Sequence, residues 1–406
     1  MLGTSWRAGL AAAVTAAAAL VGGPVAAAPA APAAPGGTPP PPDQDPFYRP
    51  AGAIAGLPPG TILGSRQVTV AALGVPVPVA AWQLLHTSTD TRGAAEAAVA
   101  TVLLPGTPAP AGGRPLVSYQ VAEDSLSTAC APSYEMRLGR EAEEPLIAQA
   151  LAQGWAVVVP DYEGPGSQWT AGTQAGHAVL DAIRAAERFA PAGLAGAGTP
   201  VGLWGYSGGA QATAWATELQ PGYAPELRIA GAAEGGVPPD IAQVARAIDG
   251  GPASGLYFGA AVGLSRAYPE IGAPSFLNEK GRAAFARIGG ECIDQFAREY
   301  AFQRLEDYTT VGDPLALPAV QRVVAEDRLG QRTPAAPLHV YHAALDELIP
   351  VAGVRALVAG YCAAHVAVEY REDLLGDHVS LAATGAPEAV AYLAARFQGL
   401  PAPRTC

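Results

Sequence analysis

The apolar residues of this chain fall into short runs separated by polar and glycine-rich connections. The first three runs partly alternate between apolar and polar positions, which is typical of antiparallel strands. The later runs are continuous and rich in Val, Leu and Trp, as expected for parallel strands buried on both faces. The predicted strands are residues 67–73, 81–86, 97–104, 116–121, 156–160, 202–206, 228–233, 338–342 and 366–370.

Helical patterns lie between most of the later strands and after the last one. An antiparallel start followed by alternating strands and helices predicts an α/β fold, with a mostly parallel sheet flanked by helices. The predicted helices of this core are residues 144–153, 174–189, 208–220, 351–365 and 387–396.

About 100 residues, 235–337, contain no clear strand, which is too long for a structureless loop. Three stretches within this segment have helical character, at 240–248, 281–288 and 318–328. We therefore predict that 235–337 is a helical cap, inserted into an α/β core formed by residues 45–234 and 338–406.

The N-terminal segment has the features of a secretory signal peptide. Arg7 provides a positive charge, and an apolar run at 10–21 is too short and too weakly hydrophobic for a stable membrane span. Small residues at 25–27 offer a cleavage site. We predict a signal peptide over residues 1–27 and a secreted, extracellular protein; an uncleaved anchor is the alternative. Residues 28–44 form a Pro/Ala-rich linker that cannot pack a core.

Composition and charge narrow the functional class. Half of the 406 residues are hydrophobic, which is ample for a large core. The net charge of −12 and the lack of a basic run argue against nucleic-acid binding. In an exported chain, an even number of cysteines predicts disulfides, here two, and the sequence alone leaves three pairings open. The cysteines match no zinc-binding spacing; they are Cys130, Cys292, Cys362 and Cys406.

The strongest chemical signal is the pentapeptide GYSGG at residues 205–209. It follows a predicted apolar strand and precedes a predicted helix, which is the setting that a G-x-S-x-G nucleophile elbow requires. Ser207 is the predicted nucleophile, and serine needs an adjacent base to act as one. Because a helix N-terminus directs its N–H groups at negative charge, the amide of Gly208 is one predicted oxyanion donor. The alternative is a glycine-rich turn that happens to contain a serine.

The partners of the nucleophile should follow it in the order acid, then histidine. Asp346 comes just after the predicted strand 338–342, where the orienting acid belongs. Glu347 is its neighbouring competitor, and capping of the next helix is the alternative role for Asp346.

His378 is the predicted general base, because it alone lies in a loop after a late strand. The alternative is a solvated histidine in a helix-capping loop. The other histidines lie in predicted strands or helices, and we expect them to be structural; they are His86, His177, His339, His342 and His365.

Two further loops lie after predicted strands. The backbone amide of Asp124, in the loop after the strand 116–121, is a weaker candidate for the second oxyanion donor. Residues 161–166 carry two carboxylates, which could suggest a metal site. Their Gly and Pro content favours a shaped turn instead.

These motifs, together with several others, make the chain similar to the secretory lipase family of fungi and actinobacteria, the lipase-A type of α/β-hydrolase. The similarity covers nearly the whole mature chain. It implies Ser207, Asp346 and His378 as a catalytic triad, the amides of Asp124 and Gly208 as oxyanion donors, and disulfides Cys130–Cys292 and Cys362–Cys406. The motifs are DPFY at 45–48, SYQ at 118–120, EDS at 123–125, CAPSY at 130–134, PDYEGP at 160–165, GYSGG at 205–209, LDE at 345–347, Pro350 and GDH at 376–378.

The resemblance also implies a reaction. Family members hydrolyse triacylglycerols and simpler esters without a cofactor or metal, and the inserted segment acts as a lid that lines an acyl tunnel. The expected partners are a lipid or small ester substrate and a transient lipid–water interface, with no obligate protein partner. The alternatives are a short-chain carboxylesterase, an acyltransferase or peptidase on the same fold, and a non-catalytic binding protein.

Overall fold

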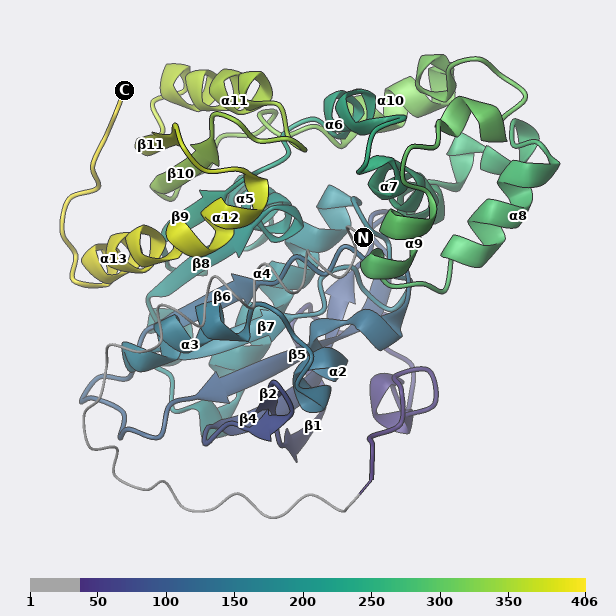
Figure 1. Ribbon diagram of the computed structural model, residues 1–406. Helices are drawn as coiled ribbons and strands as arrows, with labels where there is room; N and C mark the ends of the chain where they lie inside the picture. The colour runs from purple at the N-terminus through teal and green to yellow at the C-terminus, as the bar shows by residue number, and fades with distance from the viewer. Residues whose placement is uncertain (1–36) are drawn as a thin grey trace.

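The computed structural model describes residues 37–406, so the predicted signal peptide and residues 28–36 of the predicted linker lie outside the described residues. A nine-stranded sheet forms the centre of this described part (Figure 1). Strands β1, β4 and β5 pair antiparallel, β5 pairs antiparallel with β7, and all later pairs are parallel. In spatial order the strands are β1 (Ile62–Val68), β4 (Ala80–Thr89), β5 (Ala95–Leu104), β7 (Ala156–Pro160), β6 (Leu116–Gln120), β8 (Val201–Tyr206), β9 (Ile229–Gly235), β10 (Leu338–Ala343) and β11 (Val368–Asp373).

Helices cover both faces of the sheet, as the continuous apolar strands require. Every residue of β6, β7, β8 and β10 is buried. Alternate strand residues enter two separate cores: Val158 packs with the helices of one face, and Val157 and Val159 pack with those of the other. The first face carries α4 (Gly172–Arg188), α5 (Gly208–Tyr223) and α11 (Val351–Ala363), and the second carries α2 (Pro132–Leu138), α3 (Glu144–Ala152), α12 (His378–Thr384) and α13 (Ala386–Phe397).

Five α-helices lie between β9 and β10, within the segment expected to form a cap. Figure 1 shows α7, α8 and α9, in green, gathered at one side of the sheet. Two of these helices, α7 and α9, were not expected from the sequence. These five helices, called the cap here, are α6 (Ile241–Ile248), α7 (Ser254–Ala267), α8 (Glu279–Ile288), α9 (Ile293–Glu299) and α10 (Pro318–Glu326).

The glycines of α7 explain why its sequence pattern is weak. A Cβ on Gly259 would overlap the rings of Phe296 and Trp169, and one on Gly263 would overlap the backbone of Trp169. Glycine disfavours an isolated helix. Here close packing against α9 and the loop before α4 outweighs that penalty.

Several predicted boundaries were wrong at the ends of the sheet. The first predicted strand, 67–73, begins instead at Ile62 and ends at Val68, and the residues after it form a small hairpin of β2 (Ala71–Ala72) and β3 (Val75–Pro76). Leu73 has a φ of 50°, which no strand residue adopts. His365 was expected in a helix, yet α11 ends at Ala363 and His365 has a φ of 63°.

Two disulfides attach peripheral segments to the core. Cys130 is bonded to Cys292, which joins the segment before α2 to the start of α9 in the cap. Cys362 is bonded to Cys406, which holds the C-terminus against α11. Over residues 37–406, none of the helices combines the length and apolar character needed to cross a bilayer.

Candidate active site

Ser207 occupies a sharp turn between β8 and α5. Its φ of 56° and ψ of −122° are strained for a residue with a side chain. The turn is held because the Ser207 amide donates to the carbonyl of Gly235 at 2.8 Å. A Cβ on Gly205 would overlap the Gly209 backbone, and one on Gly209 would overlap the carbonyl of Gln120. The two outer glycines of GYSGG are therefore required by close backbone approach.

The structure brings the three predicted side chains into one hydrogen-bonded row. His378 Nε2 lies 2.8 Å from Ser207 Oγ, and His378 Nδ1 lies 2.7 Å from Asp346 Oδ2. Both distances suit a base that takes the serine proton and an acid that orients the imidazole. The row is arranged at the carboxyl ends of β8, β10 and β11, as the positional argument expected.

His378 is the first residue of α12, so its expected location in a loop was wrong. The Asp377 side chain caps this helix by accepting the amide of Ser380 at 2.7 Å. The His378 amide donates to Glu347 Oε2 at 2.9 Å, and its carbonyl accepts the Tyr206 hydroxyl at 2.5 Å. The backbone that carries the imidazole is thus fixed on both sides.

The two carboxylate oxygens of Asp346 have different hydrogen-bond partners. Its Oδ1 accepts the amides of Leu348 at 3.0 Å and Ile349 at 2.7 Å, while Oδ2 faces His378. Burial alone would raise the pKa of Asp346, but the hydrogen bond and the charge of His378 outweigh it and leave that pKa lowered. Nearby His342 is itself fully buried, and burial lowers its pKa. A negative Asp346 beside a neutral His342 suits the role of imidazole orienter.

The loop that carries Asp124 packs directly over the start of α5. Asp124 has a φ of 43°, and its Oδ1 accepts the indole N–H of Trp169 at 2.8 Å. A Cβ on Gly208 would overlap the Asp124 carboxylate, so the elbow needs glycine here too. Burial raises the pKa of Asp124 to about 6. Asp124, Ser207 and Gly208 line one common cavity.

Buried polar side chains hold the loop around Asp124, and sequence analysis missed them. The amide of Ala122 donates to Glu143 at 3.0 Å, that of Glu123 to the Tyr162 hydroxyl at 3.2 Å, and that of Ser125 to Glu163 at 3.3 Å. These contacts join residues 21 to 39 positions apart. No local pattern marks such long-range pairs.

The carboxylates of residues 161–166 bind protein groups in a Gly-shaped turn, with Gly164 at a φ of 70°. Asp161 accepts the amide of Ser133 at 2.9 Å and its hydroxyl at 2.5 Å. Burial and the nearby charge of Asp124 raise the pKa of Glu163, while the hydrogen bond from the Ser125 amide favours its charged form. Within residues 37–406 no group of three or more candidate side chains is arranged to hold a metal ion.

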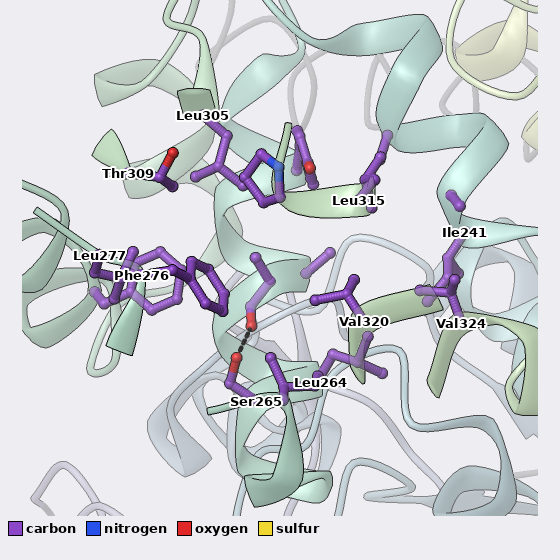
Figure 2. Close-up of a pocket in the computed structure, with 18 residues that line it drawn as sticks. Ile241, Leu264, Ser265, Phe276, Leu277, Leu305, Thr309, Leu315, Val320 and Val324 are labelled. Atoms are coloured by element: carbon purple, nitrogen blue, oxygen red, sulfur yellow. Dashed lines mark hydrogen bonds between the residues drawn. The ribbon is translucent and has the colours of Figure 1, made fainter. Parts of the chain in front are cut away.

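Two cavities that differ in polarity meet at Ser207. The first, of about 80 Å³, contacts Gly208 and is mainly apolar. It shares Ile241, Ala245, Tyr257 and Ala260 with a further apolar cavity inside the cap, of about 60 Å³ (Figure 2). The second, of about 230 Å³, is lined by His378 and Tyr206 and carries several carboxylates.

Over most of its length, the chain is similar to known proteins named as lipases. A family model described as secretory lipase matches residues 136–404. Lipase A of Arthroderma benhamiae is 36% identical over 385 residues, which cover 89% of this chain and 81% of that protein. A Mycobacterium tuberculosis protein named probable inactive lipase is 38% identical over 369 residues, which cover 88% and 82% of the two chains. The X-ray structure of Candida antarctica lipase A has a TM-score of 0.84 and 31% identity, covering 90% of this chain and 88% of that chain.

Proposed function

The chain belongs to the secretory lipase family and is a carboxylic ester hydrolase, and from this premise we propose that it cleaves lipid esters through an acyl-enzyme on Ser207. The observation that carries the proposal is the row of contacts from Asp346 through His378 to Ser207, at 2.7 and 2.8 Å. Such a row lets a weak hydroxyl act as a nucleophile.

The proposed reaction has two acyl-transfer steps. Ser207 Oγ attacks the ester carbonyl while His378 Nε2 takes its proton, and Asp346 stabilises the resulting imidazolium. The amides of Gly208 and Asp124 donate to the tetrahedral oxyanion, where one donor can contribute about 10²–10³ in rate. His378 then protonates the leaving alcohol, and water, activated by the same base, attacks the acyl-enzyme and releases the acid.

One relative, the Mycobacterium tuberculosis protein, is named as probably inactive, so the geometry around Ser207 decides whether this chain can act as an enzyme. The distances around Ser207 support a working nucleophile, because neither partner has to move to reach it. A non-catalytic binding protein has no need of a strained serine held against a base. The elbow therefore favours an enzyme over that alternative.

The apolar cavities favour long acyl chains over the short-chain carboxylesterase alternative. Their lining within the cap is almost entirely aliphatic and aromatic, and Figure 2 shows Leu264, Phe276, Leu305 and Val320 around this space. Because the cap contributes this lining, we propose that it acts as the acyl-binding lid. Triacylglycerols are then the expected substrates.

A phenylalanine at Ala260 should shorten the acyl site. Ala260 lines both apolar cavities, so the larger ring would reduce the space for an acyl chain in both. We expect kcat/KM for C12–C16 p-nitrophenyl esters to fall about tenfold, since each CH₂ kept out of an apolar site costs about 0.8 kcal/mol. Hydrolysis of C2–C4 esters should change less than about twofold. Ala283→Phe, on the exposed face of α8, is the matched control, and equal loss for all chain lengths would contradict this acyl site.

Exposed leucines beside the triad support contact with a lipid–water interface. Leu345 follows β10, Leu374 and Leu375 follow β11, and the paired strands end in register at Ala343 and Asp373. Leu375 is 94% exposed. Apolar side chains at such a position suit a lipid surface better than water. Secretion is proposed on the family, the two disulfides and the signal-like N-terminus.

Covalent labelling tests the proposal directly. We expect a fluorophosphonate probe to modify the folded protein at Ser207 and to abolish release of fatty acid from a triacylglycerol emulsion. Competing alcohols would divert the product to new esters if transfer to a non-water acceptor were the main reaction. A folded protein that neither reacts with the probe nor releases fatty acid would refute the enzyme assignment.

A further inference from the structure

The cavity on the His378 side of Ser207 differs in chemistry from the apolar cavities. Its volume is about 230 Å³, and its lining includes His378, Val379 and Tyr206. The apolar cavity on the Gly208 side contacts Ser207 but not His378. The two halves of an ester that reacts at Ser207 therefore meet different surroundings.

In the proposed mechanism, the alcohol portion and the acyl portion of the ester lie in different cavities. The leaving oxygen must lie near His378 Nε2, because that atom gives it a proton. The alcohol portion consequently occupies the cavity that His378 lines, and the acyl chain extends the other way into the cap. This assignment depends on the proposed function.

The alcohol-side cavity is rich in carboxyl groups. Arg298 is the single lysine or arginine among the described residues that line it. Not every acid there carries a full free charge: Glu135 is paired with Arg140 at 2.6 Å, burial raises the pKa of Glu143 to about 8, and burial raises the pKa of Glu123 well above its usual value. The acids, besides Asp124, are Glu123, Glu135, Glu141, Glu143, Asp294 and Glu347.

The side chain of Glu123 is buried at the wall of this cavity, and one of its oxygens lacks a hydrogen-bond partner among the described residues. The residue is only 5% exposed, yet its Oε2 has no hydrogen-bond partner among the described residues. An unpaired buried polar atom is costly unless a ligand or water satisfies it. Because Glu123 lines the alcohol-side cavity, its wall contains a polar group that no described residue satisfies.

We propose that the cavity beside His378 is a leaving-group site that prefers esters whose alcohol carries a cationic nitrogen over esters of neutral alcohols of the same shape. A cation there is attracted by Asp294, Glu347 and Glu141, and the low-dielectric walls focus that attraction. An anionic alcohol meets the same groups as a repulsive surface. The acyl cavities contribute less to this selection, because their lining is mainly apolar and Asp124 is the one acid among the described residues in it.

The test compares two esters of one acid, butyrylcholine and 3,3-dimethylbutyl butyrate, in which a carbon replaces the cationic nitrogen. Their kcat/KM ratio is measured for the wild-type protein and for Asp294→Asn combined with Glu141→Gln. Asp307→Asn, an exposed aspartate in the cap that does not line the cavity, is the matched control. Comparing ratios between variants cancels the intrinsic reactivity of the two leaving groups.

We expect the cation-to-neutral ratio to fall at least threefold in the double variant and to stay unchanged in the control. The ratio should also fall as salt is raised from 0.02 to 0.5 M, because exposed charges are then screened. An unchanged ratio in the double variant, with both esters still cleaved, would overturn the inference and leave the proposed function intact. Failure to cleave either ester would count against the proposed function itself.

Discussion

Alanine at position 207 should lower kcat for ester hydrolysis by a factor of about 10⁵–10⁶, because the acyl-enzyme can no longer form. Loss of the nucleophile removes the function of His378 as well. Ser207→Ala and Ser207→Ala/His378→Ala should therefore be nearly equally inactive, since residues that act as one unit are not additive. Any remaining rate above that in water reflects the oxyanion donors and substrate binding alone.

A measurement of thermal stability distinguishes loss of the nucleophile in Ser207→Ala from misfolding of the variant. Alanine keeps a Cβ at the strained φ of 56°, so the elbow gains no new clash, and thermal unfolding should stay within about 2 °C of the wild type. Ser275→Ala, which removes an exposed hydroxyl in the cap, is the matched control and should keep full activity. Retention of more than a few per cent of activity by Ser207→Ala, with the wild-type fold, would show that another residue is the nucleophile.

The sheet was predictable because burial on both faces leaves a direct sequence signature. The runs at β7 and β8 are continuous and apolar, and each is buried over its full length; β10 is also fully buried, although it contains His339 and His342. The sequence pattern of the early strands was a weaker guide to their burial. Polar residues in β4, such as Gln83 and Thr87, are buried through partners far along the chain: Gln83 donates to the Ser133 carbonyl and Thr87 to the Pro58 carbonyl.

The location of the site was predictable for a topological reason. Parallel strands end at one edge of a sheet, so residues just after β8, β10 and β11 must lie near each other. The groups that hold the oxyanion loop could not be found in this way. Glu143, Tyr162 and Glu163 reach their amides only in the folded chain, and an isolated acid in a sequence does not indicate which amide it will bind. The start of α12 at His378 was missed because its cap, Asp377 with Ser380, resembles an ordinary polar loop.

Asparagine at position 346 should reduce kcat by about 10³–10⁴ while leaving the shape of the site intact. Asp346 Oδ2 accepts the Nδ1 proton of His378, which leaves Nε2 free to take the serine proton. An asparagine amide can instead donate to Nδ1, and the ring then carries its proton on Nε2, where it cannot act as a base. The expected defect is therefore a fall in kcat, with KM changed much less.

Glu347 provides the comparison that identifies the acid, because it is the adjacent carboxylate and contacts the same histidine. Its Oε2 accepts the backbone amide of His378, not the ring, so Glu347→Gln should keep activity within about tenfold. The lowered pKa of Asp346 adds a stability signature: its charge stabilises the fold above the unfolded-state pKa of about 4 and loses this effect as pH falls through the lowered native pKa. Wild-type and Asp346→Asn unfolding free energies should consequently differ most near neutral pH and converge in strong acid. Equal kcat losses in Asp346→Asn and Glu347→Gln would contradict the assignment of Asp346, because only a contact with the ring nitrogen controls the tautomer.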